Sequence, residues 1–440
     1  MPAATDAVLS TRARVASVLC VGSGLALGLA GDPVAHPLLS QALWLAAVGA
    51  LAVVLTTVKG KDAPAFLGFW FILGTALLMR LAYLPTYPVS DDVNRYIWEG
   101  IVQGSEYSPY QLSPSAFFLD ADYWLVLDRV NQPDLTAAYP PLVMLHFKAL
   151  AIPYYHTQNV ELAYMVHKIA AMGADLCILA VLGRLLHERR QPMAWLVVYA
   201  WNPLVLTMGA GEAHLDVYQT LYLVVGAYFM LRPKPMPWIA WPVLGGAVMM
   251  KYFAVILLPF FLTRRNWKYA PLAALPLLSF LAFPEGGWFD SLRKFGAEFH
   301  YLDVLPRGLR VVVPSPTAGL IAAGILAVAL AALWWRDRRR RLPRITTLML
   351  GWGALLVCLP TVHPWYALPL IALAALRPSR AVLVLSASMS MGIWTYAHLA
   401  ETGNWQELPW VVALVWLPPA AALAWDVYSA RRSMGETAAA

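Results

Sequence analysis

Charged residues are scarce in this chain. Only 13% of its 440 residues are Asp, Glu, Lys or Arg, whereas 60% are hydrophobic. A soluble domain normally carries about a quarter of its residues as charges, so an ordinary soluble enzyme is excluded. The charges that remain stand in short breaks between apolar runs. This pattern indicates a polytopic integral membrane protein in contact with membrane lipids.

Cysteine is also nearly absent, with Cys20, Cys177 and Cys358 each lying inside an apolar run. Three separated thiols cannot form a disulfide framework, and they lack the clustering that a thiolate metal site needs. We interpret all three as packing residues.

The net charge of +7 does not indicate a nucleic-acid partner, because the basic residues form short clusters between apolar runs. If the N-terminus is cytoplasmic, 22 of the 32 Lys and Arg residues fall on the inner side, as the positive-inside rule requires. Both termini are then cytoplasmic. The loop from Pro85 to Pro141 faces outward, with eight acidic residues against two Arg.

The apolar runs predict the membrane spans, and most of them are long enough to cross as helices. Uncharged runs occupy 15–31, 33–58, 63–79, 193–211, 217–231, 235–250, 252–263, 269–284, 311–335, 345–376, 381–400 and 408–425. We expect 15–31 to be a retained first span rather than a cleaved signal peptide. The segment 161–186 is a further span, and its Lys168 and Asp175 must then face protein or a water-filled cavity.

Two of these runs contain breaks. The run 345–376 is interrupted at His363-Pro364 and predicts a helical hairpin, whereas 235–263 predicts two short helices on either side of Lys251. Leu142 to Tyr155 is apolar but short, which favours an interfacial helix.

These patterns predict an all-α polytopic transmembrane helix bundle. We expect a single domain over residues 1–440, with about twelve spans plus the broken pair. Two extracytoplasmic loops, 85–160 and 285–310, would carry the residues that lie outside the membrane.

The most polar stretch runs from Tyr87 to Gly100, directly after an apolar run, and we interpret it as the reaction centre. Ser90 can cap a helix whose first turn holds Asp91 and Asp92. Arg95 would lie one turn beyond Asp91, with Glu99 one turn further on the same face. The alternative is an ordinary N-terminal capping cluster at a membrane surface.

Four other polar features are expected on or near the outer side. They are Tyr139, the group Glu212, His214 and Asp216 at a hairpin tip, Lys251 within an apolar run, and His363 followed by Trp365 and Tyr366. Ionisable residues at membrane depth are functional candidates because burying them costs free energy. Simpler interpretations remain open: Lys251 could snorkel to the surface, His363 could be a helix-starting loop residue, and His214 could pair locally with Asp216.

These residues suit displacement of a lipid phosphate by a sugar or lipid hydroxyl. Asp91 or Asp92 would take the acceptor proton, and we expect Asp91 to lead because Arg95 would keep it ionised. Lys251, Arg95 or His363 would hold the leaving phosphate.

The remaining candidates would bind substrate, namely Tyr139, Glu212, His214, Asp216, Trp365 and Tyr366. No cofactor is required by this inventory, and Asp92 is the candidate ligand for a divalent cation such as Mg or Mn.

Recognisable motifs appear in a specific order. The stretch from Ser90 to Gly100, Asn202-Pro-Leu followed by His214 and Asp216, the Lys251 run, and His363 to Tyr366 together resemble integral-membrane GT-C glycosyltransferases. The resemblance covers about 65 to 430, and it is closest to bacterial mannosyltransferases that use polyprenyl-phosphate-mannose.

This resemblance implies a GT-C fold in the bacterial cytoplasmic membrane, with the active site extracytoplasmic. It also implies a polyprenyl-phosphate sugar donor, inversion at the anomeric carbon, a hexose that is mannose in the first instance, and a lipid or glycan acceptor. Glu99 stands where the family commonly has Asp, and no large soluble C-terminal domain is present, so the acceptor stays open.

A transporter or flippase of a lipid-linked or small solute is the main rival from another class. It would predict repeat-related halves with broken helices at matching positions. The sequence shows one broken pair, around Lys251, and no matching partner.

Overall fold

The computed structural model describes residues 2–58, 63–105, 107–117, 124–127, 129–339 and 342–439. Four acidic residues counted in the first outer loop (106, 120, 122 and 128) and four of the inner basic residues (59, 61, 340 and 341) lie outside the described residues. Within those ranges the fold is all-α, and the one β-bridge joins Tyr301 to Thr361. The predicted fold class is confirmed.

The chain starts with three helices, continues into an outer block of short helices, and then enters the helices of the bundle. The first part contains α1 (Pro2–Leu29), α2 (Pro37–Thr56) and α3 (Phe69–Leu81). The outer block contains α4 (Asp92–Ile101), η1 (Val102–Ser105), η2 (Pro114–Phe117), α5 (Trp124–Leu127), α6 (Pro141–Leu150) and α7 (Ile152–Thr157).

The middle of the chain contains α8 (Val160–Glu188), η3 (Met193–Leu196), α9 (Val197–Ala200), α10 (Pro203–Val205), η4 (Leu206–Gly211), α11 (Asp216–Leu231), α12 (Pro237–Met250), η5 (Tyr252–Leu257), α13 (Leu258–Phe261) and η6 (Trp267–Ala282). The last part contains α14 (Asp290–Glu298), α15 (Leu305–Leu309), α16 (Ser315–Arg338), α17 (Arg344–Cys358), η7 (Pro364–Ala367), α18 (Leu368–Leu376), α19 (Arg380–Ser388), η8 (Met389–Gly392), α20 (Ile393–Thr402) and α21 (Pro409–Ala439).

Fewer helices reach full membrane length than the apolar runs suggested. Among the described residues, six helices are long and apolar enough to cross, and a pair bent by 49° (Met193–Ala200 with Pro203–Gly211) would make seven. Five more apolar helices have only 10–17 residues. Proline explains part of the difference, because it ends a helix at the preceding residue. Pro203 separates the bent pair, and Pro237 and Pro364 start two of the short helices.

Both predicted breaks are present. Helix α12 ends before Lys251, whose backbone is extended (φ −160°, ψ 126°), and η5 begins at the next residue. Helix α17 ends at Cys358, and the chain turns back through η7 from Pro364 into α18. Lys251 therefore lies where α12 ends, and His363 lies directly before η7, as the residue that precedes a helix start.

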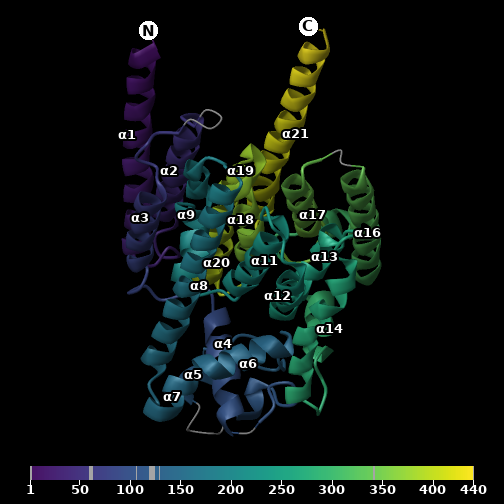
Figure 1. The fold of residues 1–440 in the computed structure, drawn as a ribbon. Coiled ribbons are helices and arrows are strands. Elements are labelled where there is room, and N and C mark those ends of the chain that lie inside the picture. Colours follow the sequence, from purple (N-terminus) through teal and green to yellow (C-terminus); the bar gives the residue numbers. More distant parts are fainter. Residues whose placement is uncertain are drawn as a thin grey trace.

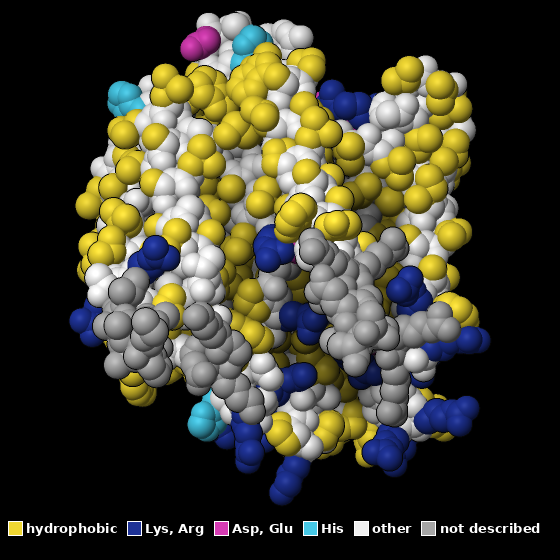
Figure 2. Space-filling model, turned by 90° about the horizontal axis from the view of Figure 1, so that it is seen from above, with side chains coloured by type: hydrophobic (Ala, Val, Ile, Leu, Met, Phe, Trp, Pro, Cys, Tyr) yellow, Lys and Arg dark blue, Asp and Glu magenta, His cyan; other side chains and the backbone are white. Residues whose placement is uncertain are grey.

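Both termini lie at one end of the molecule, and α4 to α7 lie together at the opposite end (Figure 1). On the face near the termini, Lys and Arg side chains gather and few acidic side chains are visible (Figure 2). The outer block packs closely: a Cβ on Gly100 of α4 would lie 2.5 Å from the carbonyl oxygen of Phe147 in α6. Glycine at this position therefore allows the two helices to meet.

The two charged residues predicted to face protein within α8, Lys168 and Asp175, do so. Asp175 of α8 is fully buried, and its Oδ2 lies 2.5 Å from Nε of the equally buried Arg80 in α3. Lys168, also of α8, donates to the carbonyl oxygens of Tyr83 and Thr86. Because Tyr83 and Thr86 precede the acidic motif, Lys168 fixes where the chain leaves α3 for the outer block.

Candidate active site

The acidic motif is held at its start by Glu212. The two carboxylate oxygens of Glu212 accept hydrogen bonds from the backbone N–H groups of Val89 (3.0 Å) and Ser90 (2.8 Å). Ser90 Oγ in turn accepts a hydrogen bond from the N–H of Asp92 at 3.2 Å. The expected cap is corrected, because α4 begins at Asp92 and Asp91, not Ser90, occupies the capping position. Glu212, expected to bind substrate, instead orients the chain that leads into the Asp pair.

Asn131 joins the two aspartates. Its Nδ2 donates to Oδ1 of Asp91 and to Oδ1 of Asp92, both at 2.9 Å. Asp91 is exposed, whereas the Asp92 side chain is 22% exposed. The surrounding protein displaces water from Asp92 and, together with the negative charge of Asp91, raises the pKa of Asp92 to about 7. Loss of water also raises the pKa of Asp91, and donation from Asn131 opposes the rise in both.

Arg95 does not pair with Asp91, so the expected ion pair is corrected. Arg95 Nε lies 2.8 Å from Oε1 of Glu99, as predicted for that pair. Its other nitrogens donate to backbone carbonyls of the loop that carries Asn131, namely Asn131 (3.3 Å), Gln132 (3.2 Å) and Leu135 (2.5 Å). The long side chain reaches along the helix to this loop rather than back to Asp91. Its nitrogens are thereby engaged, so Arg95 positions Asn131 rather than facing a phosphate.

Asp92 faces the polar interior of the site. Its Oδ2 lies 3.8 Å from His214 Nδ1 and accepts a hydrogen bond from the Tyr96 hydroxyl at 3.4 Å. His214 is fully buried, and its Nε2 has no hydrogen-bond partner among the described residues. Tyr139 lies on the far side of Tyr96, with ring centroids 5.8 Å apart. Asp92, His214 and Tyr139 therefore share one region, although they are far apart in sequence.

Three rings stack behind Asp92. His214 lies against Trp365 with centroids 3.6 Å apart, and Trp365 lies against His363 at 4.3 Å with nearly parallel planes. Tyr301 of the second outer loop packs against His363 at 4.8 Å, and its backbone pairs with the strand-like segment around Thr361. The second loop therefore positions His363.

Lys251 is bound to a buried carboxylate. Its Nζ lies 2.9 Å from each oxygen of Asp216, which is fully buried, and 3.9 Å from the ring centroid of Tyr366. The Lys251 carbonyl accepts hydrogen bonds from Gln219 Nε2 at 2.6 Å and from the backbone N–H of Ala254 at 3.3 Å, which hold the chain at the helix break. Lys251 therefore does not snorkel to the surface, and Asp216 pairs with Lys251 rather than with His214.

The structure thus gathers the predicted site residues around Asp92, and it adds two groups that the sequence did not single out. Asn131 and Tyr96 contact the aspartates directly. Tyr96 could have been found, because it is one helical turn from Asp92. Asn131 carried no signal, since its contact with Asp91 joins residues 40 positions apart in the sequence.

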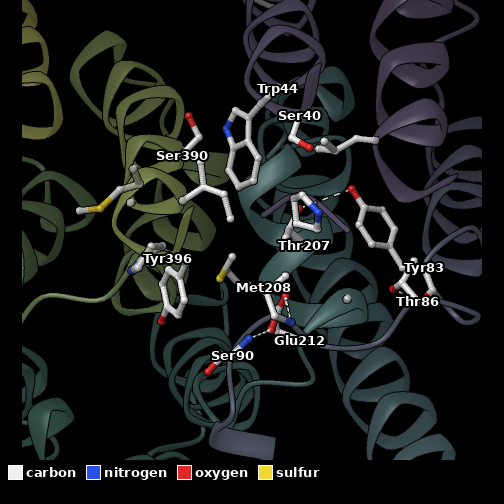
Figure 3. Close-up of a pocket in the computed structure, with 18 of the residues that line it drawn as sticks. Ser40, Trp44, Tyr83, Thr86, Ser90, Thr207, Met208, Glu212, Ser390 and Tyr396 are labelled. Atoms are coloured by element: carbon white, nitrogen blue, oxygen red, sulfur yellow. Dashed lines mark hydrogen bonds between the residues drawn. The ribbon is translucent and has the colours of Figure 1, made fainter. Parts of the chain in front are cut away.

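A pocket adjoins this site (Figure 3). Trp44 and Ser390 line it at one end, and Ser90 and Glu212 line it at the other. Trp365 is also in its wall, so one ring of the stack faces the pocket while the neighbouring Tyr366 contacts Lys251.

Metal binding has limited support from the side chains. Among the described residues there is no group of three or more His, Cys, Asp or Glu that could hold an ion. Asp91 and Asp92 offer two hard carboxylate ligands, so an ion bound there would take its other ligands from substrate and water.

Comparison with known proteins gives a consistent family. Residues 16–265, more than half of the chain, match the family described as "Alpha-(1->6)-mannopyranosyltransferase, N-terminal domain". The chain is 25% identical over 399 residues to alpha-(1->6)-mannopyranosyltransferase A of Mycobacterium tuberculosis (strain ATCC 25618 / H37Rv). The aligned region covers 80% of this chain and 74% of that relative. No solved structure matches. The matched region contains the Asp pair, His214, Asp216 and Lys251, and with the apolar helices it shows that the chain belongs to the alpha-(1->6)-mannopyranosyltransferase family, as an integral-membrane mannosyltransferase of the GT-C type.

Proposed function

We propose that this enzyme transfers mannose from a polyprenyl-phosphate donor to a hydroxyl of a lipid or glycan acceptor, with inversion, at the extracytoplasmic face of the cytoplasmic membrane. One observation carries the proposal. At the start of α4, Asp92 of the Asp pair lies 3.8 Å from His214, which stacks on Trp365 and through it on His363. The buried Lys251–Asp216 pair is close enough for its ammonium to lower the pKa of Asp92. This arrangement provides a base on one side and cationic or hydrogen-bonding groups on the other, which displacement of a phosphate requires.

In this reaction the acceptor oxygen forms a bond to the anomeric carbon while the bond from that carbon to the phosphate oxygen breaks. Asp91 takes the proton of the acceptor hydroxyl, because its carboxylate is exposed and an acceptor can reach it. The polyprenyl phosphate leaves with the electrons of the broken bond. Since attack and departure occur on opposite sides of the carbon, the configuration inverts.

Lys251 and His363 would hold the departing phosphate. A Lys ammonium has three N–H groups, and the two Asp216 oxygens occupy at most two of them, which leaves one for a phosphate oxygen. His363 Nδ1 is buried without a hydrogen-bond partner among the described residues, so it can accept or donate one bond to a ligand. Asp92 would position the acceptor or contribute to a Mg or Mn site, which restoring each ion to EDTA-treated enzyme would test.

The location of the site is supported by the charge distribution. The outer block with the Asp pair lies at the end opposite to both termini (Figure 1), and basic side chains gather at the end of the termini (Figure 2). By the positive-inside rule the basic end is cytoplasmic, which puts the Asp pair outside.

The test is donor consumption by purified protein in lipid nanodiscs with a panel of polyprenyl-phosphate sugars. We expect polyprenyl-phosphate-mannose to be consumed in the presence of an acceptor, and the product to have the anomeric configuration opposite to that of the donor. GDP-mannose serves as the control donor. Consumption of GDP-mannose instead, or retention of configuration, would contradict the proposal.

A further inference from the structure

The pocket beside the Asp pair has a lining that selects one kind of ligand. It lies between the α1–α2 hairpin, η4 and the η8–α20 region. Figure 3 shows Trp44 and Ser390 at one end of the hollow, with Ser90 and Glu212 at the other. Ser90 is the residue before Asp91, so one end of the pocket reaches the proposed base.

The lining contains no cation. Among the described residues that form the wall there is no Lys, Arg or His, and the one charged group is Glu212. A neighbouring cavity that shares Gly31, Thr86 and Tyr396 likewise has Asp32 as its one charged lining residue. A phosphodiester placed here would lose hydration without gaining a positive partner, which is costly. The pocket is therefore unsuited to the charged head of a polyprenyl-phosphate sugar.

Neutral hydrogen-bonding groups and aromatic rings take the place of cations. Several hydroxyl groups line the pocket, together with five aromatic side chains, namely Trp44, Tyr83, Tyr87, Trp365 and Tyr396. Gln41 is 9% exposed; one end of its amide bonds Ser390 Oγ at 2.6 Å, while its Oε1 has no partner among the described residues. An unpaired buried amide atom is unfavourable unless a ligand supplies its partner. A hydroxyl group would do so.

The cations nearest to the pocket lie beyond its wall. Lys168 is bound by the backbone carbonyls of Tyr83 and Thr86, and Lys251 is bound by Asp216. Trp365 faces the pocket, whereas Tyr366 contacts Lys251, and the planes of these two rings are almost perpendicular (79°). A charged donor head and an uncharged acceptor can therefore occupy different sides of the Asp pair.

We propose that this pocket binds the acceptor, as an uncharged glycoside with an apolar anchor, with its sugar hydroxyls toward Ser90 and its anchor along α2 and α20. The assignment as acceptor rests on the proposed transfer function. Binding of an uncharged glycoside does not, so the two can be tested separately.

The binding test uses two photoreactive probes and needs no turnover. One is octyl α-mannoside with a diazirine in its alkyl chain, and the other is the corresponding octyl phosphate mannose. We expect the uncharged probe to label peptides containing residues 40–44 or 389–396, and excess octyl mannoside to suppress the labelling. Ile393→Trp, which fills the pocket, should remove the labelling, whereas Leu320→Trp, on the exposed face of α16, should not. Stronger labelling of these peptides by the phosphate probe, or labelling that survives Ile393→Trp, would overturn the proposal.

The kinetic test addresses the acceptor role. With wild-type transfer established, Ile393→Trp should raise the acceptor KM about tenfold or more and change the donor KM less than twofold. A raised donor KM with an unchanged acceptor KM would show that the pocket serves the donor. Absence of transfer in the wild type would refute the proposed function and leave the labelling result intact.

Discussion

Asp91 and Asp92 are neighbours in sequence but have different surroundings. Asp91 is exposed, whereas Asp92 lies 3.8 Å from the buried His214. We predict that Asp91→Asn reduces transfer by at least about 10²-fold, the loss typical of removing a general base, while the donor still binds. Asp92→Asn should leave a weak residual activity. Sugar transfer and donor binding are measured for both variants.

The pair of variants discriminates between roles. Wild-type activity in Asp91→Asn together with loss in Asp92→Asn would transfer the role of base to Asp92, whose raised pKa also suits proton transfer near neutral pH. Wild-type activity in both variants would reject catalysis at this site.

Asn131 should determine the pH at which the pair ionises. Its amide donates to both carboxylates, favours their charged forms and so lowers the pKa of each. We predict that Asn131→Ala raises these pKa values, so the acid limb of the kcat/KM profile moves to higher pH. Asn131→Ser, which keeps one donor, should restore part of the shift.

Other charges around Asp92 are unchanged by this substitution. Asp91 and Asp216 raise the pKa of Asp92, Lys251 lowers it, and His214 and Tyr96 approach its carboxylate. A shift of the acid limb in Asn131→Ala would therefore result from loss of the Asn131 amide. A lower kcat with an unmoved acid limb would mean that Asn131 affects only the shape of the loop.

At the scale of elements, the break after α12 places the Lys251 ammonium against Asp216. We predict that Lys251→Ala weakens donor binding about tenfold or more, in line with the 1.5–3 kcal/mol typical of hydrogen bonds to charged groups, and lowers turnover. His363→Ala should have a milder effect, because it removes a single hydrogen-bonding group. The measurements are donor Kd and kcat.

Lys251→Ala leaves Asp216 buried without its partner, which can destabilise the fold by about 3–5 kcal/mol. The double variant Lys251→Ala with Asp216→Asn removes this unpaired charge and separates stability from binding. Recovery of the melting temperature without recovery of donor affinity supports the phosphate role. Wild-type donor affinity in a folded variant would assign the pair to structure alone.

The features that could be predicted from the sequence are those determined by residues close to one another in the chain. Proline and a lone charge marked the breaks at Pro364 and Lys251, and the i,i+4 spacing predicted the Arg95–Glu99 pair. The Arg95–Asp91 pair was wrong because the guanidinium is held by loop carbonyls 36 to 40 residues away. The Asn131 bridge and the stack of His214 on Trp365 join distant segments, so no local pattern could reveal them.

At the scale of the whole molecule, the family match favours a mannosyltransferase over the rival interpretation as a transporter. The family match covers the motifs from the Asp pair to Lys251, and the polar side chains converge on one site toward the end of the bundle that lies opposite to both termini. Alternating access would instead need a site between two related halves.

The two outer loops must lie on the same side of the membrane, because they are bonded to each other. Thr136 and Ser291 share a hydrogen bond of 2.7 Å between their hydroxyls, and Gln111 Nε2 donates to the carbonyls of Glu285 and Gly286. The positive-inside rule puts the Arg-rich end of α16 on the other side.

In a background without the three native cysteines, we predict that Ser105→Cys and Asp290→Cys react with an impermeant maleimide in intact cells. Arg339→Cys should react only after permeabilisation. Labelling of position 339 in intact cells would reverse the orientation and move the Asp pair inside, whereas disagreement between positions 105 and 290 would contradict the contact between the loops.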